Sequence, residues 1–216
     1  ISNLSFFNDY SQSNKIDPSI FIDGLDVLNL GYFFLIILII LFLSNKHNIV
    51  VENNQIKTIF LITSFLLVLN VINYLYLGDS GSYLIGFIFG VLLIDLNNNN
   101  YFISPYFIAL LLWYPAFENL FSIIRKRIVK KDPLKPDNLH FHQLLFNFLK
   151  QSKIKIVKKY SNSASSSLII FYNSIAFIIG ANFINHTKIL LFIILINVLS
   201  YLIFYNLLKK KFNHIK

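Results

Sequence analysis

The chain has 216 residues, of which 56% are hydrophobic and only 13% are charged. Soluble domains carry about 25% charged residues, so this balance excludes an ordinary soluble domain and indicates a multi-pass membrane protein. The sequence has no cysteine, which excludes disulfide bonds and cysteine-ligated metal centres. The net charge of +9 indicates either nucleic-acid binding or the cytoplasmic loops of a membrane protein.

Six apolar runs follow one another along the chain, each long enough or nearly long enough to cross about 30 Å of hydrocarbon. They are 28–44, 58–76, 83–96, 102–121, 168–184 and 189–208. The third is short, so it begins inside the preceding Gly-Ser turn, lies where the bilayer thins, or opens onto a polar cavity. The runs predict an all-α, polytopic membrane helix bundle of about six transmembrane helices. We expect the tract Ser161–Ser167 to be a loop that leads into the fifth helix.

The bundle is expected to form a single domain over residues 1–216. Its predicted parts are a cytoplasmic segment 1–27, four helices in 28–121, a cytoplasmic basic and histidine-containing loop 122–167, two helices in 168–208 and a basic tail 209–216. The chain begins at Ile1 and contains no methionine, so we expect it to be the C-terminal part of a longer protein.

The distribution of basic residues predicts the orientation of the helices. Six spans bring 1–27, the turn at Asp79, the 122–167 loop and the C-terminal tail to one side of the membrane. Sixteen of the nineteen Lys and Arg residues fall on that side, and the other three are Lys46, Lys57 and Lys188. The positive-inside rule makes the basic side cytoplasmic. Topology thus accounts for the net charge and argues against nucleic-acid binding.

Three polar motifs fall on this same predicted side, and they define a candidate site. They are the segment 21–26, the Gly78-Asp79 turn, and the segment 136–142. Asp79 stands between Gly78 and Gly81, which permit backbone angles that other residues resist. Its carboxylate either complements the start of the following helix or provides an oxygen ligand for Mg²⁺, and the spacing leaves both interpretations open.

Two aspartates, Asp23 and Asp26, lie three residues apart before the first apolar run. On a helix start they would share one side. They either complement the dipole of the first helix or bind a metal, a sugar hydroxyl or a nucleotide.

Two histidines, His140 and His142, would share a face if their loop is extended. They are either polar loop residues or hydrogen-bond donors to phosphate. Arg125, Arg127 and Lys130 precede them on a predicted helical extension. These cations either anchor the chain at the membrane surface or neutralise pyrophosphate, for which arginine offers two parallel hydrogen bonds.

Other residues are interpreted structurally. The row Ser82, Gly86, Gly90 predicts close helix packing. Glu118 is expected at the end of its span, reaching water or a polar interior, because a charge at mid-membrane is costly. Pro115 is expected to kink the same helix.

In this order, the motifs resemble the C-terminal half of the polyprenyl-phosphate N-acetylhexosamine-1-phosphate transferase family, which is related to phospho-N-acetylmuramoyl-pentapeptide transferase. The resembling segments are 21–26, 77–87, 114–118, 125–127 and 133–144, within residues 20–150. The glycine–aspartate segment and the proline-to-histidine segment together are fairly specific, whereas either alone is weak. The two helices that follow fit the plan of the family.

The resemblance implies an enzyme that transfers a sugar-1-phosphate from a UDP-N-acetylhexosamine to a polyprenyl phosphate, and so initiates a lipid-linked cell-envelope glycan. It implies Mg²⁺ as the cofactor, with Mn²⁺ as an alternative, and Asp79 as the metal ligand. The bacterial plasma membrane is the expected location, and a homodimer is one arrangement considered. The implied catalytic residues are Asp79, Asp23, His140 and His142, and the implied substrate-binding residues are Asp26, Asn70, Arg125 and Arg127.

The chain also departs from the family pattern. It has no adjacent aspartate pair, Tyr74 stands where a lysine is expected, and Gln143 stands where a third histidine is common. Asparagines expected before the first motif fall on Asp17 and Ile20. We therefore expect this chain alone to be inactive without the missing pair. The alternatives are a non-catalytic multi-pass protein, such as a degenerate paralogue or a transporter-like subunit, and an interaction subunit that docks a partner through 122–167.

Overall fold

The computed structural model describes residues 24–47, 49, 53–72, 74–75, 77–130 and 139–213. At 24–26, 53, 79, 159, 212 and 213 the description covers the backbone alone. Six of the described helices are long and apolar enough to cross a membrane. They are α3 (Gly24–His47), α4 (Asn53–Val71), α5 (Gly78–Asn99), α6 (Pro105–Ile128), α9 (Ser161–Asn182) and α10 (Thr187–Asn213). The predicted all-α polytopic bundle is confirmed.

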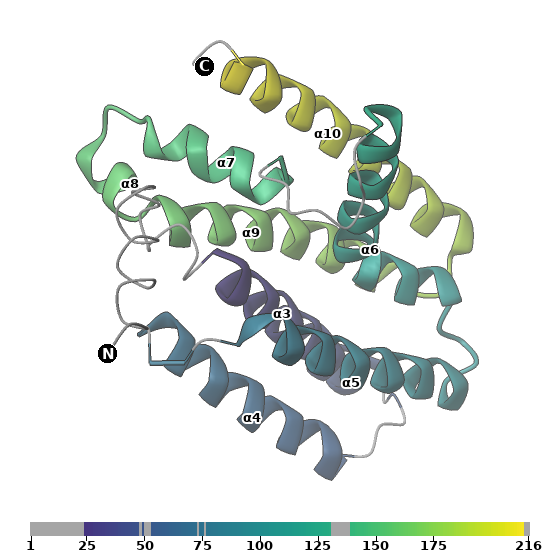
Figure 1. Cartoon of the computed structure of the whole chain (residues 1–216). Coiled ribbons are helices and arrows are strands. Elements are labelled where there is room, and N and C mark those ends of the chain that lie inside the picture. Colours follow the sequence, from purple (N-terminus) through teal and green to yellow (C-terminus); the bar gives the residue numbers. More distant parts are fainter. Residues whose placement is uncertain are drawn as a thin grey trace.

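Helix α3 lies in the interior and connects the two halves of the bundle (Figure 1). It packs against α4 and α5 on one side and against α9 on the other. Its sequence is apolar on every face, which is typical of a buried helix. Leu30, Ile36 and Leu43 have almost no exposed surface. The first apolar run of the chain therefore forms the core around which the other helices gather.

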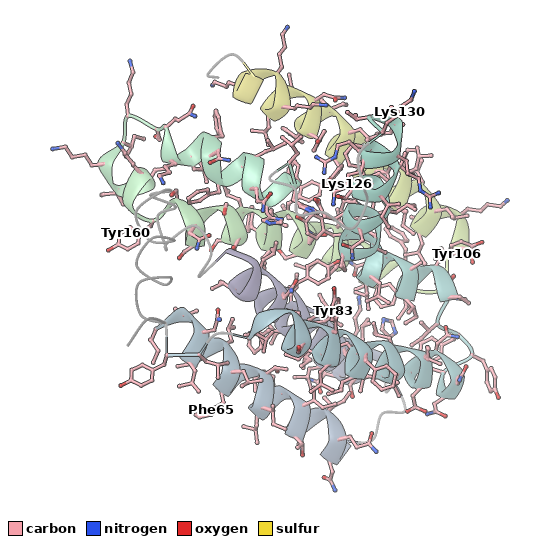
Figure 2. All side chains as sticks on the ribbon, viewed as in Figure 1. Phe65, Tyr83, Tyr106, Lys126, Lys130 and Tyr160 are labelled. Atoms are coloured by element: carbon pink, nitrogen blue, oxygen red, sulfur yellow. The ribbon has the colours of Figure 1, made fainter. Side chains whose placement is uncertain are left out.

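The outer helices expose large apolar side chains. Phe65 on α4 is 65% exposed and points away from the bundle (Figure 2), and Phe87 on α5 and Phe192 on α10 are similarly exposed. In a bilayer such side chains face lipid, where they need no protein partner. Tyr106 and Tyr160 lie toward opposite ends of the molecule (Figure 2), as aromatic residues do at the two membrane surfaces.

Polar bonds at one end of the bundle agree with the predicted alternation of helix directions. The Lys46 Nζ donates to Asn182 Oδ1 at 2.8 Å, which joins the C-terminal ends of α3 and α9. The Ser104 hydroxyl lies 3.0 Å from that of Thr187, and the Ser104 N–H donates to the Ile184 carbonyl at 2.9 Å. We call this region the Ser104 end. The region where α7 begins lies against the middle of α10 (Figure 1) and is called the His140 end.

Helix α6 continues beyond the apolar run 102–121, as the predicted helical extension, and it bends. It ends at Ile128. Figure 1 shows its ribbon turning so that the last part crosses the direction of α9 and α10. Pro115 lies inside the helix, and an internal proline is a common cause of such a bend. Lys126 and Lys130 lie on this last part (Figure 2).

The segment 122–167 was predicted as one loop, and this is wrong for most of its described residues. It contains the end of α6, the ten-residue helix α7 (Phe141–Lys150), the short α8 (Lys155–Lys159) and the start of α9. Helix α7 packs against both α9 and α10 and lies between them (Figure 1). Leu144 on α7 is almost fully buried there. Part of the predicted loop is therefore a helix that packs within the bundle.

The tract Ser161–Ser167 was predicted as a loop, and it instead forms the first turns of α9. Ser161, Ser165 and Ser166 are buried, and α9 packs against α3 and α7. The Ser165 hydroxyl donates to the Asn162 carbonyl, so it needs no water. Small side chains allow close packing of the neighbouring helices, and this packing outweighs the weak helix propensity of serine.

The third span is a full-length helix, and of the three expectations for it the first is confirmed. Helix α5 begins at Gly78, inside the Gly-Ser turn. The row Ser82, Gly86, Gly90 does not form the expected close packing among the described residues. A Cβ added at Gly86 would only touch the Phe33 ring at 3.9 Å, and one at Gly90 would meet nothing within 4 Å.

Candidate functional site

The glycine–aspartate corner is described mainly by its backbone. Gly78 has a φ of 64°, which glycine adopts without strain. A Cβ at Gly81 would lie 2.8 Å from the Leu77 side chain, so a larger residue there would require that side chain to shift. Asp79 is the second residue of α5, where a negative charge is favoured. Its side chain lies outside the described residues, so both interpretations of Asp79 remain predictions.

The side chains of the other two predicted aspartates, Asp23 and Asp26, lie outside the described residues. Asp23 lies outside the described residues, and Asp26 is described by its backbone alone, as the third residue of α3. Their predicted roles therefore stay predictions. The side chain of Ser82 does not cap α5, because its hydroxyl donates back to the Gly78 carbonyl at 2.9 Å.

A buried carboxylate at the His140 end brings together residues from three helices. The Glu118 Oε1 lies 3.0 Å from Nδ1 of His140 and accepts the Phe141 N–H at 3.0 Å. Its Oε2 accepts the Tyr201 hydroxyl at 2.6 Å. We call these four residues, Glu118, His140, Phe141 and Tyr201, the Glu118 cluster. It joins α6, the start of α7 and α10.

The chemistry of the Glu118 cluster favours an ionised carboxylate. Both oxygens of Glu118 accept hydrogen bonds, and hydrogen bonds to the charged form stabilise that form. One of the donors is the first N–H of α7, where the helix dipole also favours a negative charge. A buried charge is tolerated when it is paired and hydrogen-bonded in this way.

Sequence reasoning placed Glu118 at the end of its span, and this is wrong. The helix continues to Ile128, so Glu118 lies well inside α6, and it is 8% exposed. Glu118 was expected to reach either water or a polar interior, and it reaches a polar interior. The role of Glu118 toward the histidines was missed. The available signal was an acid inside an apolar run followed by two histidines, because a buried carboxylate needs such donors.

The two predicted histidines do lie together. The rings of His140 and His142 stack, with centroids 5.6 Å apart and planes 22° from parallel. His140 has an extended backbone immediately before α7, so the two rings share a face although His142 is already helical. Gln143, which stands where the family commonly has a third histidine, accepts the His140 N–H at 3.3 Å. It thus supports the start of the helix.

His142 is buried and electrically neutral near pH 7. The pKa of His142 is lowered from 6.5 to about 4: burial lowers it most, the charge of Glu118 raises it in part, and the proximity of His140 lowers it by a smaller amount. Its Nε2 has no hydrogen-bond partner among the described residues. A buried ring nitrogen without a partner is unfavourable, which singles out His142 as a residue that could receive a polar group.

Arg125 fastens the same region from within the protein. It is 8% exposed, and its guanidinium donates to the Leu139 carbonyl, to the Tyr205 hydroxyl at 2.6 Å and to the Ser122 hydroxyl at 3.2 Å. These bonds tie α6 to α10 and to the residue before His140. The predicted role of Arg125 in binding substrate stays a prediction. Arg127, two residues later, is exposed.

Asn70 was predicted to bind substrate, and the structure describes it at the connection between α4 and α5. It is buried, and its Nδ2 donates to the Leu75 carbonyl at 3.0 Å, which closes the turn after α4. Its Oδ1 has no partner among the described residues. Tyr74, which replaces the expected lysine, is 84% exposed.

A metal ion was predicted at this end of the bundle. Within the described part of the chain, no group of three or more His, Asp or Glu side chains gathers to hold one. Both oxygens of Glu118 already accept protein hydrogen bonds, so Glu118 does not fit the role of a metal ligand. The Mg²⁺ prediction therefore depends on Asp79, whose side chain lies outside the described residues.

Comparison with known proteins gives no match: no protein-family model, no curated protein and no solved structure matches this chain. The functional argument consequently depends on the residues of the chain itself. Those that the structure brings together at the His140 end are the Glu118 cluster, His142 and Arg125.

Proposed function

We propose that this multi-pass membrane protein is a sugar-1-phosphate transferase. A terminal oxygen of a polyprenyl phosphate attacks the β-phosphorus of a UDP-N-acetylhexosamine. The bond between that phosphorus and the bridging oxygen breaks, and UMP leaves with the electron pair. The product is a lipid pyrophosphoryl sugar that starts a cell-envelope glycan. The His140 end faces the cytoplasm of a bacterial cell, in line with the positive-inside rule.

The observation that carries the proposal is the fixed histidine pair at the His140 end. His140 is held by Glu118 and stacks on His142, and all of this lies among helices that are otherwise apolar. Ionisable groups inside membrane helices are rare and are found chiefly at working sites, because burying them is unfavourable. The motif order of the sequence adds the specific chemistry, by resemblance.

The roles of the residues follow from the charge on the substrates. Phosphoryl transfer is catalysed mainly by positioning and by neutralising phosphate charge. His140, whose side chain is 24% exposed, can reach a phosphate oxygen, whereas Glu118 is too enclosed to do so. The exposed Arg127 and Lys130 at the end of α6 attract the anionic substrates. A Mg²⁺ ion on Asp79 would neutralise charge on the phosphate oxygens.

A second candidate is a non-catalytic membrane protein of the same architecture. The hydrogen bonds of Asn70 and Arg125 favour this candidate, because both side chains donate to backbone carbonyls of the protein. In that case the buried polar groups only hold α6, α7 and α10 together. Substitutions at the His140 end would then change stability without changing any reaction.

The test is release of UMP by the purified protein, expressed from its complete coding region and supplied with Mg²⁺, polyprenyl phosphate and a UDP-N-acetylhexosamine. We expect His140→Gln to lower the rate by about 30-fold or more, because a positioned acid or donor is worth about 10²–10⁴. His186→Gln is the matched control, since His186 is an exposed histidine at the Ser104 end. Equal rates for the two variants would favour the second candidate.

A further inference from the structure

Glu118 makes a contact that orients one particular nitrogen of His140. The Glu118 Oε1 lies 3.0 Å from Nδ1 of His140, and the same oxygen accepts the Phe141 N–H. Since Phe141 follows His140 directly, one oxygen fixes both the ring and the backbone that carries it. The other oxygen is held by the Tyr201 hydroxyl at 2.6 Å, which prevents the carboxylate from rotating.

The contact with Glu118 favours one ring nitrogen of His140 as the site of the proton. A carboxylate is an acceptor only, so Nδ1 of His140 must be the donor when Glu118 is ionised. The two nitrogens of an imidazole point along different edges of the ring, so Nε2 is directed away from Glu118. In metal sites and catalytic triads, a partner on one ring nitrogen sets the tautomer that the other nitrogen presents.

His140 and Glu118 differ in how exposed their side chains are. The side chain of His140 is 24% exposed and that of Glu118 is 10% exposed, although the two are in direct contact. A ligand can therefore touch His140 but has little access to Glu118. The neighbouring His142 is more buried than His140 and has no acceptor on Nε2 among the described residues.

We propose that Glu118 is a positioning residue that holds His140 with its proton on Nδ1 and presents Nε2 to the phosphate of the substrate. This inference rests on the proposed function for the identity of the substrate. With its proton on Nδ1, the Nε2 of His140 is an acceptor. It accepts a hydrogen bond from the hydroxyl of a singly protonated substrate phosphate.

The experiment reads the protonated nitrogen directly, by ¹⁵N NMR of the full protein with labelled histidine in lipid nanodiscs. The His140 signals are identified by their loss in His140→Gln. We expect wild-type His140 to carry its proton on Nδ1. Glu118→Gln keeps an acceptor oxygen toward Nδ1 and so keeps this tautomer, whereas Glu118→Leu loses the acceptor and the tautomer becomes mixed. Tyr201→Phe leaves the tautomer unchanged, because Tyr201 contacts the other oxygen.

Kinetics supply the second measurement. Glu118→Leu is expected to lower kcat for UMP release at least tenfold while KM stays within about twofold, and Glu118→Gln recovers part of the loss. If Glu118 has only a structural role, its variants lower the amount of folded enzyme. The ring proton of His140 then has the same position in Glu118→Gln and Glu118→Leu.

Two results overturn the inference. One is a wild-type His140 with its proton on Nε2, a result that does not depend on whether any variant folds. The other is a folded Glu118→Leu protein whose His140 tautomer matches the wild type. If the wild-type protein releases no UMP at all, the proposed function fails, and the NMR result still decides whether Glu118 positions His140.

Discussion

The Ser104 end and the His140 end both join helices from distant parts of the chain, but they do so with different residues. At the Ser104 end the joining groups include the exposed Lys46 and Asn182 and the hydroxyls of Ser104 and Thr187. At the His140 end they are charged or aromatic side chains that are almost fully enclosed. Hydroxyls and exposed pairs suffice to close a bundle, so the buried Glu118 and Arg125 are more than closure requires.

The difference has an energetic meaning. Exposed polar pairs contribute little to stability, whereas removing one partner of a buried polar contact is strongly destabilising. Stability and pH dependence should therefore be concentrated at the His140 end.

Arg125→Ala should have the largest effect. It leaves the Leu139 carbonyl and the Tyr205 hydroxyl without their guanidinium donor and opens a gap between α6 and α10. We expect a loss of about 3–4 kcal/mol in the free energy of unfolding. Arg127→Ala, on the exposed side of the same turn, should change it by about 0.5 kcal/mol or less. Reversible unfolding in mixed micelles measures both, and equal losses would contradict the contrast between the ends.

His142 should make the protein less stable in mild acid. Because its pKa is 6.5 in the unfolded chain and about 4 in the folded protein, the unfolded state binds the extra proton between these values. The free energy of unfolding therefore falls as the pH drops from 6.5 to 4, by about 3 kcal/mol from this residue. Unfolding at pH 7.5 and pH 4 should show this loss in the wild type and in His186→Phe. A loss of the same size in His142→Phe would show that His142 is not its source.

Tyr201→Phe should remove one hydrogen bond from the Glu118 carboxylate. The bond is buried and its acceptor is charged, so we expect a loss of about 2 kcal/mol. The control is Tyr172→Phe. The Tyr172 hydroxyl, on an exposed face of α9, contacts Ser200 of α10 and should contribute about 0.5 kcal/mol or less. Thermal unfolding of both variants sharpens the comparison, and a larger effect for Tyr172→Phe would reverse it.

Lys46→Ala should have the smallest effect. The bond from Lys46 to Asn182 lies at the surface of the Ser104 end, where both side chains are exposed. We expect a change of about 0.5 kcal/mol or less, measured in the same unfolding assay. A loss as large as that of Arg125→Ala would show that the Ser104 end also depends on buried charge.

The apolar runs predicted the six spans because membrane helices need long apolar segments whatever their neighbours are. The helix ends were less predictable. Ser161–Ser167 is helical because α3 and α7 pack against it, and no local pattern contains that information. The last turns of α6 were predicted as a helical extension, but the contacts of Arg125 with α10 and Leu139 that hold them were not.

The candidate site was predictable in part. His140 and His142 were expected to share a face, and they do. Glu118 was not assigned to them because the sequence places it 22 residues before His140, and only the bend of α6 and the position of α7 bring the two together. The predicted roles of Asp79, Asp23 and Asp26 remain predictions.

The most direct test of the account compares two aspartates on one helix. Asp79 lies at the start of α5 and Asp95 lies near its other end, with an exposed side chain. In the Mg²⁺-dependent UMP release assay, with the protein expressed from its complete coding region, Asp79→Asn should lower the rate by about 100-fold or more, because it removes the proposed metal ligand. Asp95→Asn should match the wild type. Equal activity of the two variants, or no UMP release by the wild-type protein, would contradict the proposed function.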